Sequence, residues 1–237
     1  MLGQREATTY DLLKTVLIVL MIVDHLAYFF FPDQLWMRAI GRWCVPGWFF
    51  LVGYSHKGGF DPALWLAAVI MVAAEHSGLD KPLPLNILLG MALIRFALPY
   101  ADRLLRPRWL LAPLFVALVL LNGIVTPYIE YGTLGLMLAL WGWLLRSGEK
   151  TAALAWSAAV MMYFVALQTW VFSFGIADGR IMLLGVLAMY IALWFFRPVP
   201  LSLQHAGVQK ALQFMGRQTL LIYVVHFLTF ALLARVL

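Results

Sequence analysis

Long apolar runs recur along this chain, and they constrain its fold more than any other feature. A helix needs roughly 20 apolar residues to cross the hydrocarbon core of a bilayer. The predicted spans cover residues 11–31, 36–54, 62–76, 83–100, 108–125, 128–145, 152–173, 181–196 and 214–235. The runs are continuous, whereas strands of a membrane barrel would alternate in polarity. We therefore expect an all-α, polytopic membrane bundle of about nine transmembrane helices, forming one domain over residues 1–237.

Charged residues are too scarce for a soluble surface. They make up 12% of the chain, and 64% of the residues are hydrophobic. A soluble domain carries about 25% charged residues, so a soluble globular enzyme is excluded, as is a disordered chain. Cys44 is the only cysteine, which excludes an intrachain disulfide scaffold. The net charge of +6 is better explained by basic cytoplasmic loops than by nucleic-acid binding.

The distribution of lysine and arginine predicts the orientation. Short cytoplasmic loops carry an excess of these residues. With the N-terminus inside, the outer side collects only Arg38, Lys81, Arg180 and Arg235, whereas the inner side collects Arg5, Lys14, Lys57, Arg103, Arg106, Arg108, Arg146, Lys150, Arg197 and Lys210. We expect a cytoplasmic N-terminus and, with nine helices, an outer C-terminus.

Asp24 and His25 interrupt the first apolar run, which argues against a cleaved signal peptide. An ionisable residue inside a span is costly and suggests a functional site. Neighbours on a helix point about 100° apart, so one side chain can face a cavity while the other pairs sideways. His25 should lie roughly 8 Å below the outer helix end. It could act as a general base, or the pair could simply bond between helices.

Three further residues belong to the same outer half. Arg42 lies in the second run at about the depth of Asp24, its natural carboxylate partner, and this pair could be structural, catalytic or both. His226 lies in the last run with Tyr223 three residues earlier on the same helix face. A helix contact and a site role are both open for His226.

Charged residues near the predicted helix ends have a simpler explanation. Glu130 opens the sixth run, where an acid complements the helix dipole. Lys14, Arg95 and the Arg103–Arg108 cluster lie toward the inner face, where they fix topology or bind an anion such as phosphate. The five histidines show no metal-ligand spacing, so we expect no metal site.

Several segments together resemble the TraX family. They are Tyr10-Asp11-Leu12-Leu13-Lys14, Met21-Ile22-Val23-Asp24-His25, Gly41-Arg42-Trp43-Cys44-Val45-Pro46-Gly47-Trp48-Phe49-Phe50, Glu130-Tyr131-Gly132 and the stretch from Met215 to His226. They cover almost the whole chain in the expected order. The family is known for acetylating the N-terminus of conjugative pilin, and it looks like a compact relative of the acyltransferase-3 membrane enzymes.

The second likeness carries over to particular residues. Acyltransferase-3 enzymes have a basic residue, ten residues and a catalytic histidine in the first helix, and Lys14 and His25 have that spacing. The closing helix of those enzymes carries a pattern similar to that around His226. They also use an Arg-x-x-Arg motif, and Arg103–Arg106 is the one such spacing in this chain.

The resemblance implies an acetyltransferase of the bacterial inner membrane. Acetyl-CoA would be the donor on the cytoplasmic side, and a pilin or another envelope acceptor would present its amine on the outer side. His25 and Asp24 would be catalytic, with His25 acting as a base or carrying the acetyl group. Residues binding substrate or cofactor would be Lys14, Arg42, Arg95, Glu130, Tyr223 and His226. No nucleic-acid partner is expected.

Other functions remain open from the sequence. One is O-acetylation of an envelope carbohydrate. A second, of a different class, is a small-solute or proton-coupled transporter that uses Asp24, His25 and Glu130 as a relay. A third is a non-enzymatic assembly factor of an envelope machine. The absence of an internal repeat disfavours the transporter.

Overall fold

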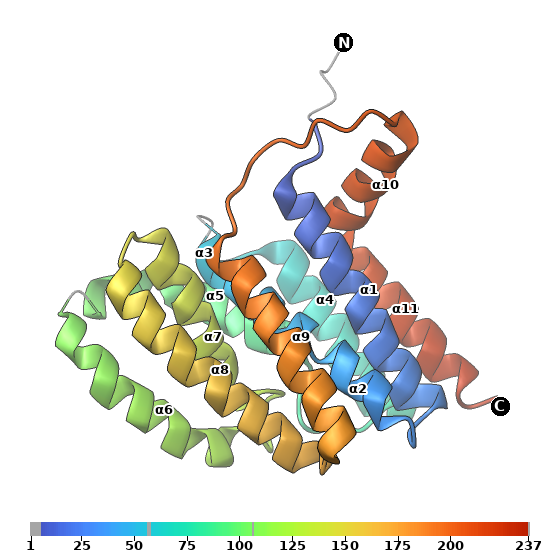
Figure 1. Cartoon of the computed structure of the whole chain (residues 1–237). Helices are drawn as coiled ribbons and strands as arrows, with labels where there is room; N and C mark the ends of the chain where they lie inside the picture. Colours follow the sequence, from blue (N-terminus) through green and yellow to red (C-terminus); the bar gives the residue numbers. More distant parts are fainter. Residues whose placement is uncertain (1–5, 56–57, 106, 237) are drawn as a thin grey trace. The chain divides into compact units, whose positions relative to one another are not determined.

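The computed structural model describes residues 6–55, 58–105 and 107–236, which fold into helices joined by short loops (Figure 1). Helix accounts for 78% of the structure, and no strand occurs in these ranges. The elements are α1 (Thr9–Phe30), α2 (Leu35–Gly41), α3 (Cys44–Tyr54), α4 (Pro62–Ala74), η1 (Glu75–Leu79), α5 (Ile87–Leu104), η2 (Arg108–Leu110), α6 (Leu111–Val125), α7 (Gly132–Arg146), α8 (Lys150–Phe172), α9 (Ile176–Trp194), α10 (Ala206–Arg217) and α11 (Thr219–Leu233).

The expected all-helical membrane fold is confirmed, but the count of nine spans is not. Within the described residues, five stretches are long and apolar enough to cross a membrane: α1, α4 with η1, η2 with α6, α8 and α9. A sixth span results if α10 and α11, which are bent by 76°, count as one broken helix. Residues Ile87–Ala101 of α5 and the whole of α7 (Gly132–Arg146) form shorter apolar helices.

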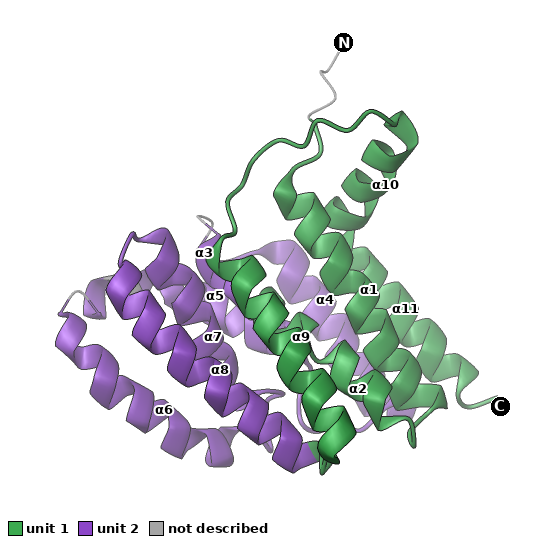
Figure 2. Ribbon diagram, viewed as in Figure 1, with its two compact units in different colours: residues 1–48, 172–237 green, residues 49–171 purple. Residues whose placement is uncertain are grey.

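The described chain divides into two compact units (Figure 2). Unit 1 comprises residues 1–48 and 172–237, and unit 2 comprises residues 49–171. The expectation of one domain over residues 1–237 stays a prediction.

Unit 2 is built around α7, which is buried along most of its length. Every residue from Leu134 to Leu144 except Leu136 is buried, and Trp141 is completely covered. Glycines let α3 approach α7 closely. A Cβ added at Gly53 would lie 1.7 Å from the Ala139 carbonyl oxygen, and one at Gly142 would lie 2.2 Å from that of Phe50.

The prediction of one helix over residues 36–54 is wrong in one respect. The helix is interrupted at Arg42-Trp43, between α2 and α3. A continuous helix would need the nitrogen of Pro46 to donate a hydrogen bond to the Arg42 carbonyl. Proline has no such N–H, and its ring clashes with the carbonyl four residues earlier. The Arg42 carbonyl instead accepts from the Val45 nitrogen at 3.2 Å. Arg42 is therefore the C-cap of a short helix rather than a residue within a long one.

Unit 1 is organised around α1, which packs against α2, α10 and α11. Helices α1 and α11 run parallel, since Phe29 contacts Phe227 and Phe30 contacts Phe230 (Figure 1). Gly41 of α2 lies directly on the backbone of Asp24. This close crossing brings the polar residues of α2 against the centre of α1.

We expect Gly41→Ala to destabilise unit 1. The new Cβ would lie 2.4 Å from Asp24 Cβ and 2.6 Å from Asp24 Cα, so one helix must shift. Overpacking of this kind costs about 1–3 kcal/mol. Thermal unfolding in detergent measures the effect. Gly179→Ala is the control, because Gly179 of α9 has open space around it; an equal loss of stability in both variants would contradict the predicted close packing.

Candidate functional site

A pair of histidines joins α1 to α11. His25 Nδ1 and His226 Nε2 lie 2.6 Å apart, and the two rings stack with centroids 4.9 Å apart. Both side chains are half-buried. Two residues that were separate expectations thus form one hydrogen-bonded group, although they lie far apart in the sequence.

The hydrogen bonds around the pair show which nitrogen of each imidazole carries a proton. His226 Nδ1 lies 2.6 Å from the Ile222 carbonyl oxygen, which can only accept, so His226 Nδ1 carries a proton. In a neutral imidazole the other nitrogen is then an acceptor, and His25 Nδ1 must donate to it. This assignment follows from the hydrogen-bond network. It leaves Nε2 of His25 with the lone pair, which is the arrangement that a base or nucleophile requires.

Aromatic side chains enclose the two imidazoles. The buried Tyr223 ring stands edge-on to both, with its centroid 5.7 Å from that of His25 and 5.8 Å from that of His226. Phe227 lies 5.2 Å from His25, and Phe230 lies 5.6 Å from His226. This packing fixes the orientation of the rings and lowers the local polarity, which strengthens the hydrogen bonds between them.

Asp24 pairs with two arginines of the α2 segment. Arg42 Nε lies 3.4 Å from Asp24 Oδ1, and Arg38 Nη1 lies 3.1 Å from Oδ2. Arg38 also donates to the backbone carbonyl of Asp24 at 2.9 Å. All three residues are buried. The predicted pairing of Asp24 with Arg42 is confirmed.

Sequence reasoning missed Arg38, which it counted only as an outer charge. The signal was present, because Arg38 and Arg42 are four residues apart, a spacing that puts both on the same side of a helix. Both guanidiniums also lie over the ring of Phe172, 5.0 and 4.9 Å from its centroid. Arg38 contacts Tyr28 in the same way at 5.4 Å. Such cation–π contacts favour a desolvated guanidinium.

Asp24 and His25 point toward different helices, as the helical spacing predicts. Asp24 faces α2, and His25 faces α11. The carboxylate therefore joins α1 to α2, while the imidazole joins α1 to α11. A catalytic role for Asp24 stays a prediction.

Lys14 lies on the same face of α1 as His25. The two are eleven residues apart, which is about three helical turns and roughly 16 Å along the axis. The basic residue and the imidazole therefore share one side of the helix at two depths.

Arg95 and Glu130 belong to unit 2, where each has a structural partner. Arg95 Nη1 lies 2.8 Å from a carboxylate oxygen of Asp61, the N-cap of α4. Glu130 Oε2 accepts from the Ile87 nitrogen at 3.1 Å, at the start of α5. Glu130 was expected to stabilise the start of the helix that follows it in sequence, which is α7. It caps α5 instead, because Leu85, just before α5, pairs with Ile129 beside Glu130. Their proposed ligand-binding roles stay predictions.

Some residues named in the sequence predictions are not described in the structure. Arg5, Lys57 and Arg106 lie outside the described residues, so the Arg103–Arg106 spacing has no described geometry. In the described ranges, no group of three or more His, Cys, Asp or Glu residues could hold a metal ion.

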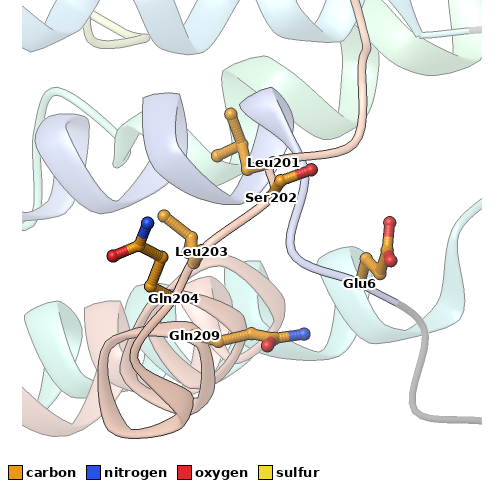
Figure 3. Close-up of a pocket in the computed structure, with 6 residues that line it drawn as sticks. All are labelled: Glu6, Leu201, Ser202, Leu203, Gln204 and Gln209. Atoms are coloured by element: carbon orange, nitrogen blue, oxygen red, sulfur yellow. The ribbon is translucent and has the colours of Figure 1, made fainter.

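A pocket of about 270 Å³ lies beside the loop that leads into α10 (Figure 3). Its lining consists of Glu6, Leu201, Ser202, Leu203, Gln204 and Gln209. None of the residues predicted for the site lines it. Its single acid and neutral side chains do not suit a phosphate.

Residues 9–234 match the family model described as TraX protein. The chain belongs to the TraX family. An uncharacterized protein of Rickettsia prowazekii (strain Madrid E) is 25% identical over 151 residues, which cover 63% of this chain and 60% of that protein. The matched region thus spans less than two thirds of that relative. No solved structure matches the chain.

We expect Arg38→Gln to destabilise this TraX-family protein by about 3–5 kcal/mol, because removing one partner of a buried charge cluster leaves the others poorly compensated. Arg180→Gln is the control, since Arg180 of α9 is exposed. Thermal unfolding in detergent compares the two. Asp24→Asn added to Arg38→Gln should recover part of the loss; equal stability of wild type and Arg38→Gln would show that the cluster is not stabilising.

Proposed function

We propose that this protein is an integral-membrane acetyltransferase. It would move an acetyl group from acetyl-CoA to an amine presented on the other side of the membrane, namely the N-terminal amine of a pilin. The observation that carries the proposal is the hydrogen-bonded pair of His25 and His226, surrounded by aromatic side chains inside a membrane bundle. Its hydrogen bonds leave the lone pair on His25 Nε2. Family membership supports the same chemistry.

The histidine pair suits acyl transfer to an amine. Acetyl-CoA supplies the acetyl group as a thioester. When an amine attacks the thioester carbon, the amine nitrogen must lose a proton and the departing sulfur must gain one. His25 Nε2 would take that proton, while His226 accepts the hydrogen bond from His25 Nδ1 and keeps the ring in the required tautomer. The proton then returns to the thiolate.

A covalent route would use the same nitrogen. His25 Nε2 would attack the thioester carbon, and the thiolate would leave. The amine would then take the acetyl group from the imidazole, and its proton would pass through the freed Nε2 to the thiolate. The base and the acetyl-carrier roles both require the lone pair on Nε2. Both therefore depend on the same hydrogen bonds.

Lys14 is suited to hold the donor. Its place on the same face of α1, roughly 16 Å from His25, allows a phosphate to be bound at one depth while the thioester lies at the other. Arg95, which pairs with Asp61, is the second residue proposed to meet phosphate. We propose a cytoplasmic N-terminus in a bacterial inner membrane, which places Lys14 on the side of acetyl-CoA.

The transporter alternative has weaker support. Its relay would need Asp24 and Glu130 to exchange protons with His25. Asp24 is held by two arginines, and Glu130 caps α5. O-acetylation of a carbohydrate remains the second candidate, because the same nitrogen could accept a hydroxyl proton.

We expect His25→Ala to abolish acetyl transfer while insertion and yield stay normal. His226→Ala should lower the rate about 10²–10⁴-fold, because it removes the acceptor that orients His25. The assay measures acetylated pilin N-terminal peptide by mass spectrometry. His205→Ala is the control, since His205 is exposed in a loop. Normal turnover by His25→Ala would refute the proposed mechanism.

We expect Lys14→Gln and Arg95→Gln each to weaken coenzyme A binding about tenfold, because each removes a charge that meets phosphate. His25→Ala should leave binding nearly intact. Isothermal titration of the purified variants measures this, with Lys150→Gln as a control at an exposed site. If His25→Ala loses binding while the two basic variants keep it, the donor is bound at the histidine pair and the two-sided arrangement is wrong.

A further inference from the structure

Helix α10 has an apolar face and a polar face. Val208, Ala211 and Met215 lie along one side, and Gln209, Lys210, Gln213 and Arg217 lie along the other. The protein leaves much of the apolar side uncovered: Val208 is 49% exposed and Ala211 is exposed, whereas Met215 is half-buried. Phe214, which lies between this side and Lys210, is 60% exposed. A helix of this kind, with basic residues on its polar face, is typical of the membrane–water interface.

The direction of α10 fits that position. It meets α11 at a bend of 76°, and α11 runs parallel to the spanning helix α1. If α1 and α11 cross the bilayer, α10 lies close to the membrane plane (Figure 1). Gly216 at the end of α10 packs on the backbone of Asp11 near the start of α1, which holds α10 at this level.

The length of α11 adds a second argument. It has 15 residues, which give about 22 Å of helix, whereas the hydrocarbon core is about 30 Å thick. A short span is accommodated by local thinning of the bilayer or by flanking residues at the interface. An amphipathic helix continuous with α11 would draw the membrane surface toward the protein at this end.

The charged residues on and around α10 indicate which lipid headgroups this helix would contact. Lys210 is exposed on the polar face of α10, and Arg197 is exposed in the loop that precedes it. Arg217 lies 3.9 Å from the Asp11 carboxylate, so part of its charge is already compensated. Glu6 is the exposed acid on the neighbouring segment. The exposed balance is basic, which favours anionic headgroups.

We propose that α10 is an interfacial helix whose apolar face enters the acyl-chain region and whose Lys210 contacts anionic phospholipid headgroups. This inference does not depend on the proposed acetyl transfer. It bears on the depth of the histidine pair in the membrane. His226 lies seven residues into α11, roughly 10 Å from the bend between α10 and α11. The position of α10 at the surface therefore sets the depth of the histidine pair.

Spin labels on single cysteines test the proposal. The labelled variants are Val208→Cys and Met215→Cys on the apolar face and Lys210→Cys and Gln213→Cys on the polar face, in a Cys44→Ala background. Cys44 is buried, so the wild-type background serves if Cys44→Ala fails to fold. The protein is placed in nanodiscs, and the labels are probed with oxygen and with a water-soluble nickel chelate.

The expected result is that oxygen reaches the Val208 and Met215 sites and the chelate reaches the Lys210 and Gln213 sites. Chelate access to all four would place α10 in water, and exclusion from all four would make α10 part of a broken span. Either outcome overturns the proposal. Removing anionic lipid, or adding Lys210→Gln to Val208→Cys, should raise chelate access at Val208 at least twofold. No change would overturn the assignment of anionic headgroups.

Discussion

The buried pairing of Asp24 with Arg38 and Arg42 is the interaction on which unit 1 depends. A carboxylate inside a membrane helix is costly unless cations and hydrogen bonds surround it. Here two guanidiniums share it, and the ring of Phe172 covers both. The cluster ties α2 to the middle of α1, and Gly41 permits the contact because it has no side chain.

The histidine pair follows from the same helix by geometry. Because neighbours on a helix diverge by about 100°, fixing Asp24 toward α2 turns His25 toward α11. There His226 and the Ile222 carbonyl select one tautomer of each ring. The charge cluster and the imidazoles thus perform separate tasks from adjacent positions. The first secures packing, and the second presents a single basic nitrogen, which suits the acyl transfer proposed for this member of the TraX family.

The proposed acetyl transfer would give its two substrates different routes to this site. Lys14 occupies the same face of α1 about three turns from His25. Helix α10, at the proposed membrane surface, fixes the level at which α11 enters. A donor arriving along α1 and an acceptor arriving from the opposite end could therefore meet at one nitrogen without sharing an entrance. The arginine and the glutamate of unit 2 that were expected to help, Arg95 and Glu130, each support a helix start.

The sequence by itself determined the helical membrane fold, the pairing of Asp24 with Arg42 and the face shared by Tyr223 and His226, because hydropathy and helical period are local properties. Pro46 also encoded the break after Arg42, although the apolar run hid it. Only the tertiary structure decided that His226 bonds to His25, that Arg38 joins Asp24 and that Glu130 caps α5. The His25–His226 and Glu130–Ile87 contacts join segments distant in sequence, and no local pattern specifies which neighbours packing will choose. Arg38 lies close to Asp24 in sequence, but only the packing of α2 on α1 brings its guanidinium to the carboxylate.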